Sequence, residues 1–101
     1  VTHWERETAA EHKGETGTSF WRTFEQGNIR VRRIEYSPGY LSDHWCPRGH
    51  VLLVLEGEII IDLKDERTFK LTPGMSFQVS DDEDNPHMAR TDQGAKVFIV
   101  D

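Results

Sequence analysis

The sequence predicts an all-β domain, either a sandwich or a small barrel. Short runs of alternating apolar and polar residues recur about every 8 to 12 residues, with turns rich in Gly, Pro or Asn between them. No segment has the apolar spacing of an amphipathic helix. A chain of 101 residues is long enough to form one domain that buries a modest core without disulfides.

The chain begins with a polar stretch. Residues 1–17 have neither helical nor strand periodicity, so we expect an N-terminal arm over 1–17 and a single barrel domain over 18–101. Trp4 is the exception within the arm. A tryptophan near a terminus is usually docked on a neighbouring surface, of its own chain or of a partner, because its ring is large and apolar.

Strands are then predicted along the rest of the chain. Residues 18–24 alternate, and residues 29–36 do so with a change of phase near Arg32, which predicts an inserted bulge residue there. Residues 51–55 are apolar on both faces, which indicates a strand covered by the core on one side and by another layer or subunit on the other. Further alternating runs predict strands at 58–63, 68–71, 75–79, 87–91 and 96–100.

The residues best suited to chemistry lie around one predicted turn. His44 and Cys46 would share a face if the segment entering this turn is a strand, because strand side chains alternate. Pro47 suits the second position of a turn and Gly49 the last, so the chain can return His50 beside the other two donors. Three side chains that can bind a metal ion would then converge.

These residues resemble the motifs of the cupins. The first cupin motif reads G-x5-H-x-H-x3,4-E-x6-G; here His44 stands at the first histidine, Cys46 at the second, and His50 at the glutamate. His87 matches the histidine of the second motif, after a loop two residues longer than in the pattern. The run Asp43-His44-Trp45-Cys46 is similar to small single-domain cupins with a DHCW motif. The resemblance implies a double-stranded β-helix, or jelly-roll, barrel.

The resemblance also implies a divalent transition metal inside the barrel. Its ligands would be His44, His50 and His87, with Cys46 either as a fourth ligand or beside the site. Three imidazoles and one thiolate suit zinc best and also admit iron, nickel or copper. Asp43 could orient one of the ligands through its carboxylate. Four protein ligands would close the site, whereas three would leave a position for water or substrate.

Other residues of these types have simpler interpretations. His3 and His12 lie in the polar arm and are expected to be surface or hydrogen-bonded residues. Trp45, opposite in phase to the metal donors, is expected in the core or in an interface. The acidic run 81–84 lacks the glycine and spacing of a calcium loop, so we expect a solvated loop at the mouth of the barrel.

Composition excludes several partners. The net charge of -6 and the lack of a basic block argue against nucleic-acid binding. No apolar run approaches the roughly 20 residues of a membrane span, and the chain does not start with a signal peptide's apolar core. A single cysteine suits a reducing compartment, so the sequence predicts a cytoplasmic protein.

Three functions remain open at this level. The first is a small metal-binding cupin of unsettled activity that could act on a small organic substrate. The second is a non-catalytic module that binds or senses a small ligand without an obligatory metal. The third is a protein whose metal only stabilises the fold. The sequence does not decide whether the protein is an enzyme. A homodimer is expected, because strand 51–55 and the aromatic residues Trp4, Phe20, Trp21 and Phe24 offer more apolar surface than one small barrel can cover.

Overall fold

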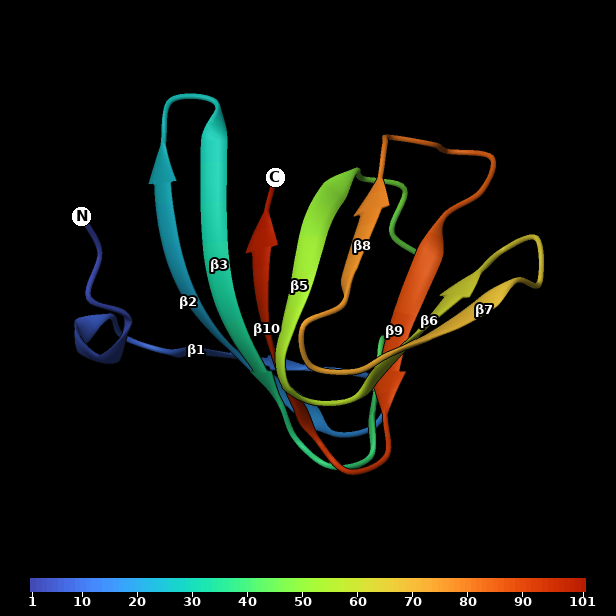
Figure 1. Cartoon of the computed structure of the whole chain (residues 1–101), viewed down its shortest axis with the longest axis horizontal. Coiled ribbons are helices and arrows are strands. Elements are labelled where there is room, and N and C mark those ends of the chain that lie inside the picture. The colour runs from blue at the N-terminus through green and yellow to red at the C-terminus, as the bar shows by residue number, and fades with distance from the viewer.

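The computed structural model describes residues 1–101 as two antiparallel β-sheets (Figure 1). The larger sheet, in spatial order, contains β1 (Ala10–Lys13), β2 (Thr18–Gln26), β3 (Ile29–Tyr36), β10 (Ala95–Val100), β5 (His50–Gly57) and β8 (Ser76–Val79). The smaller sheet contains β4 (Tyr40–Leu41), β9 (His87–Thr91), β6 (Ile59–Leu63) and β7 (Thr68–Leu71). The all-β prediction is therefore confirmed. The one helix is the single 3-10 turn η1 (Trp4–Arg6), and no helix is long and apolar enough to cross a membrane.

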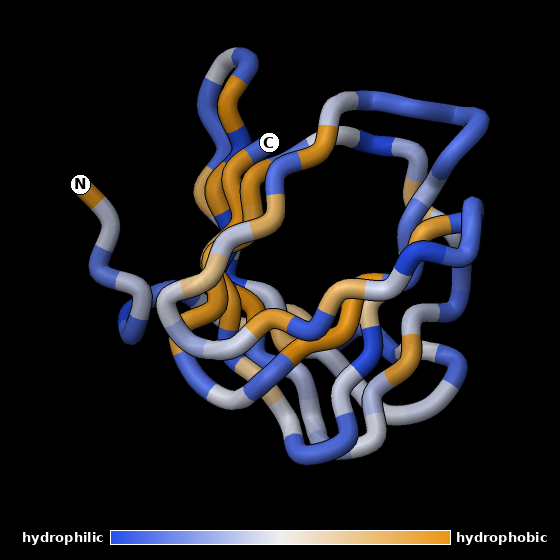
Figure 2. Tube along the Cα trace, turned by 45° about the vertical axis from the view of Figure 1, so that its right-hand side comes forward, coloured by the Kyte–Doolittle hydropathy of each residue, from blue (hydrophilic) through white to orange (hydrophobic).

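The core lies between the two sheets. Side chains of β3, β5, β6 and β10 that point to the inside are almost fully buried, and include Ile34, Leu52, Val54, Ile59, Ile61 and Val97. Figure 2 shows hydrophobic residues concentrated along the strands and hydrophilic residues in the loops that join them. Strand β5 lies between β10 and β8, so its position away from a sheet edge agrees with its apolar sequence. The alternation of each strand thus places one face in the core.

The predicted bulge in the strand 29–36 is wrong. Strand β3 pairs with β2 and β10 in unbroken register, and Arg32 shares the inward face with Ile34 and Tyr36. The apolar pattern changes phase because an arginine occupies an inward position, and no residue is inserted. The irregularity lies instead between β5 and β10, where the register shifts between Lys96 and Val97.

The N-terminal segment is more ordered than its sequence predicted. Residues Ala10–Lys13 form strand β1, which pairs with β2, so the expectation that the whole stretch 1–17 lacks regular structure is wrong. Backbone hydrogen bonding to a neighbouring strand outweighs the weak local pattern there. Trp4 docks on Phe98 of β10 with ring centroids 5.9 Å apart, as expected for a terminal tryptophan. The division into an arm and a barrel domain remains a prediction.

A matched pair of glycine substitutions tests the packing between β5 and β10. Gly57 and Gly74 both have positive φ, at 74° and 90°, so alanine at either position should cost about 1–2 kcal/mol for the left-handed backbone. A Cβ at Gly57 would also overlap the carbonyl oxygen of Gly94, whereas one at Gly74 would meet nothing. We expect Gly57→Ala to lower the free energy of unfolding by clearly more than Gly74→Ala, as measured by urea denaturation. Equal losses would contradict the close approach.

Candidate metal and ligand site

A cavity of about 120 Å³ lies between the two sheets and contains all four residues predicted as metal ligands in its wall. His50 begins β5 on the larger sheet and His87 begins β9 on the smaller one. His44 and Cys46 belong to the segment between β4 and β5. The fold therefore brings these four side chains to one cavity from two separate parts of the chain, residues 44–50 and His87.

The segment that carries His44 and Cys46 differs from its prediction. Residues 42–49 form neither a continuous strand nor a hydrogen-bonded turn. Cys46 instead forms an isolated bridge with His87: its N–H donates to the His87 carbonyl at 2.8 Å, and the N–H of His87 donates back at 2.9 Å. The backbone N–H of Gly49 donates to the Asp81 carboxylate, so the acidic loop 81–84 braces this segment. Long-range pairing replaces the local turn.

His50 and His87 are in direct contact inside the cavity. Their ring centroids are 4.7 Å apart and their planes are nearly perpendicular, at 87°. The buried Nδ1 of His50 has no hydrogen-bond partner. Burial lowers the pKa of His50 from 6.5 to about 4, with the neighbouring His87 adding to the effect, and burial also lowers the pKa of His87. Both rings are therefore neutral at pH 7, which is the form that binds metal ions.

His44 lies at the rim of the cavity. Its side chain is 74% exposed, and its Nδ1 is 2.6 Å from a carboxylate oxygen of Asp43. The hydrogen bond from His44 lowers the pKa of Asp43, so that carboxylate stays ionised and holds the ring. A carboxylate on one ring nitrogen leaves the other nitrogen free to bind a ligand, as in many metal sites. In this conformation no three donors lie close enough together to hold one ion.

Trp45, His3 and His12 lie outside the cavity. Trp45 is 37% exposed, with the ammonium of Lys64 4.6 Å from its ring centroid, so it does not lie in the core, and the alternative of an interface stays a prediction. His3 and His12 are exposed, and the ring of His12 stacks on Trp21 at 4.0 Å. These two histidines have the surface positions that were expected.

Arg32 is the cavity residue that the sequence analysis missed as a functional candidate. Only 6% of this residue is exposed, and its guanidinium lies 4.6 Å from the ring centroid of Trp21. Its Nη2 donates to Asp101 at 3.2 Å, while its buried Nε has no partner. The sequence did contain a signal for Arg32. An arginine stands at an inward position of the alternating strand 29–36, and this change of phase was interpreted as a bulge.

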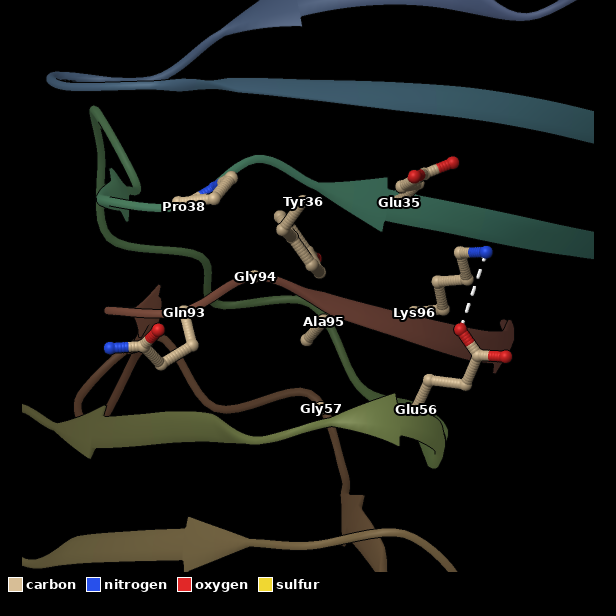
Figure 3. Close-up of a pocket in the computed structure, with 9 residues that line it drawn as sticks. All are labelled: Glu35, Tyr36, Pro38, Glu56, Gly57, Gln93, Gly94, Ala95 and Lys96. Atoms are coloured by element: carbon tan, nitrogen blue, oxygen red, sulfur yellow. Dashed lines mark ion pairs between the residues drawn. The ribbon is translucent and has the colours of Figure 1, made fainter.

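A second, larger depression lies at the ends of β3, β5 and β10. It has a volume of about 290 Å³ and is bordered by Glu35, Gly57 and Gly94 (Figure 3). Lys96 and Glu56 cross its edge as an ion pair of 3.3 Å. None of the predicted metal donors borders it, whereas all four line the smaller cavity. The smaller cavity between the sheets is therefore the better candidate site.

The buried imidazoles predict a pH dependence of stability. Because His50 titrates at about 4 in the folded chain and near its ordinary 6.5 when unfolded, the unfolded state binds more protons between these values. We expect the free energy of unfolding of the metal-free protein to fall as pH is lowered from 6.5 to 4. His50→Leu should flatten this slope in urea titrations at a series of pH values. An unchanged slope in the variant would contradict the proton linkage.

Among the comparisons with known proteins, only the comparison of structures gives matches, and these support the fold. No family model matches the sequence, and no curated protein does. Among solved structures, a predicted oxalate decarboxylase from Thermotoga maritima aligns with a TM-score of 0.82 and 12% identity over 99% of this chain and 96% of that one. A cupin-like protein from the same organism has a TM-score of 0.75 and 18% identity, over 93% of this chain and 76% of that one.

A third similar structure contains a metal ion. It is Fe(II)-HppE with the alternative substrate (S)-1-HPP, with a TM-score of 0.78 and 14% identity over 100% of this chain and 58% of that one. At these identities the likeness concerns the fold. It agrees with the two facing antiparallel sheets and with the jelly-roll prediction made from the motifs. The chain has the cupin fold, a jelly-roll β-barrel.

Proposed function

We propose that this protein is a small metal-binding cupin that holds a divalent transition metal between its two sheets. His50 and His87 would provide the first two ligands, and His44 and Cys46 would complete the set. The observation that carries the proposal is the buried Nδ1 of His50, which has no hydrogen-bond partner and belongs to a neutral ring in contact with a second neutral imidazole. A buried nitrogen without a partner is costly, and a cation would satisfy it.

The donor chemistry favours zinc. Imidazoles and one thiolate are ligands that zinc prefers, whereas manganese and magnesium prefer carboxylates, and no Asp or Glu lines the cavity. Iron, nickel and copper also accept imidazole ligands. Cys46 is a free thiol, and its backbone is fixed opposite His87 by two hydrogen bonds. We further propose a reducing location such as the cytoplasm, which would keep this thiol reduced.

Residues of the chain keep the proposed ligands in the protonation state and orientation that metal binding requires. When bound, such a metal ion can polarise a small organic substrate or lower the pKa of a bound water. Asp43 accepts a hydrogen bond from Nδ1 of His44, which leaves the lone pair on Nε2. Burial keeps His50 and His87 unprotonated. Most of the residues in the cavity wall are hydrophobic, and include Ile34, Leu52 and Ile61.

A second function has an observation in its favour. Because no three donors lie within reach of one ion in this conformation, the cavity could serve as a binding or sensing site for a small molecule without an obligatory metal. Both functions use the same cavity and a small-molecule ligand or substrate. Metal content of the purified protein separates them, since the second requires none.

Substitution of the donors tests the metal site. His50→Ala should weaken metal binding by more than about 100-fold, because removal of even an outer-shell partner typically costs 10–100-fold. Cys46→Ser should lower zinc affinity if sulfur is a ligand and leave it unchanged if sulfur lies beside the site. Metal-to-protein ratio by plasma mass spectrometry and competition with a chromogenic chelator would measure both. His3→Ala, which removes an exposed histidine, is the control and should bind metal normally. Full metal content in His50→Ala would refute the site.

We also propose that the outer face of the larger sheet forms a homodimer interface. Leu53 of β5 lies opposite Phe98 of β10 on this face, and Trp4 contacts the ring of Phe98 edge to face. Apolar side chains of the same face are between 36% and 46% exposed, namely Phe20, Phe24, Val51, Leu53 and Leu55. Glu35 and Arg33 of β3 lie on the same face between Phe20 and Phe24 of β2 and the apolar side chains of β10 and β5, so the apolar patch is that of β5 and β10. An exposed apolar patch is typical of an interaction surface, and a second copy would offer the same patch.

The dimer can be tested at Leu53. Leu53→Arg places a charge within the apolar patch of β5 and β10, so we expect it to convert a dimer to a monomer in light scattering at micromolar concentration. Met75→Arg is the matched control, because Met75 is similarly exposed, at 45%, but lies in the turn before β8. It should leave the molecular mass unchanged. A monomeric parent protein would exclude the interface.

A further inference from the structure

The barrel contains a buried cation that the proposed metal site does not explain. Arg32 points inward from β3 and borders the same cavity as His50 and His87. Burial lowers the pKa of Arg32, which reflects the cost of holding its charge away from water. Arginine nonetheless stays protonated in proteins. A buried charge of this kind needs a compensating anion.

The protein supplies only part of that compensation. The Asp101 carboxylate, itself almost fully buried, accepts hydrogen bonds from Arg30 and from Nη2 of Arg32, and Arg48 lies 3.7 Å away. Three arginines therefore share one carboxylate. Burial acts to raise the pKa of Asp101, but the hydrogen bond from Arg30 and the charge of Arg32 outweigh it, so this group contributes one full negative charge. The cluster retains an excess of positive charge.

The cavity wall adds no negative group. The residues that line it include no Asp or Glu. Arg32 is thus the fixed charge of the wall, and its buried Nε has no partner. Burial also raises the pKa of Tyr36, so this cavity residue keeps its hydroxyl proton and can donate it in a hydrogen bond.

We propose that the cavity binds a small organic carboxylate, with the carboxylate group paired to Arg32 and the organic part against Trp21 and Tyr40. The guanidinium fork matches carboxylate geometry, and hydrogen bonds between charged groups are the stronger ones. This proposal names the ligand class for the cavity of the proposed function, but the anion pairs with the protein and not with a metal ion. It therefore applies to the metal-free protein as well.

The size and polarity of the cavity favour a carboxylate over a phosphate. A cavity of about 150 Å³ is known to accommodate benzene, so about 120 Å³ fits a ligand of a few non-hydrogen atoms. The wall is mainly apolar, with Ile34, Leu52 and Ile99 among its residues. A phosphate dianion would need more donors than one arginine and two tyrosine hydroxyls supply. A monoanion with a short carbon chain is small enough for the cavity, and it needs fewer hydrogen-bond donors than a phosphate.

The test uses acetate and acetamide, which have the same shape but differ in charge. The chelator-treated full chain is titrated with each at constant ionic strength, and the indole N–H signal of Trp21 is followed by NMR. This signal is a suitable probe because the indole donates to Ser19 and its ring lies beside Arg32. We expect saturable shifts with acetate and none with acetamide. Equal shifts with both, or tighter binding of inorganic phosphate than of acetate, would overturn the proposal.

Two variants locate the anion. Arg32→Gln should weaken acetate binding by about 10-fold or more, since a hydrogen bond between charged groups contributes that much. Arg48→Gln removes the same charge from the same Asp101 cluster but lies outside the cavity wall and is more than half exposed, so binding should change less than about twofold. Unchanged affinity in a folded Arg32→Gln variant would refute the assignment. If that variant does not fold, Arg32→Lys and the comparison of acetate with acetamide on the parent chain decide the question.

The outcome is separable from that of the metal proposal. Metal content is measured without acetate, and acetate binding is measured without metal. Acetate binding in a chain that binds no metal would support this inference and refute the metal site. Metal binding in a chain that does not bind acetate would support the metal site and refute this inference.

Discussion

The pair of backbone hydrogen bonds between Cys46 and His87 is the constraint on which the site depends. The segment 42–49 has no regular structure, yet this bridge joins it to β9 of the smaller sheet. The next residue of regular structure, His50, already belongs to the larger sheet. The bridge, together with the hydrogen bonds between Ser42 and Ala89, holds Cys46 beside His87.

The cavity combines two kinds of buried polar group that are usually avoided. Two imidazoles are held neutral by burial, and one arginine is held charged with a single shared carboxylate. Each arrangement costs stability unless a partner satisfies it. A cation at the imidazoles and an anion at Arg32 would satisfy both and would attract each other. The proposed metal and the proposed carboxylate are thus electrostatically compatible occupants of one small space.

The main departures from the sequence-based predictions have physical causes. Arg32 was interpreted as the site of a bulge, because an arginine in an apolar phase contradicts the usual rule that charges face water. Its burial depends on Trp21 and on Asp101, 69 positions later in the chain. Residues Ala10–Lys13 formed a strand although their pattern is weak, since β2 offered an edge for pairing. In both cases a distant partner outweighed the local signal.

The sequence by itself determined the all-β class, most of the strands and the four candidate donors, His44, Cys46, His50 and His87. Alternation, turn residues and motif spacing are local properties, so they can be detected without coordinates. Only the tertiary structure decided that His50 and His87 touch, that His44 lies exposed at the rim, and that Arg32 enters the same cavity. These facts depend on the pairing of strands far apart in the chain and on burial between two sheets, neither of which a local pattern contains.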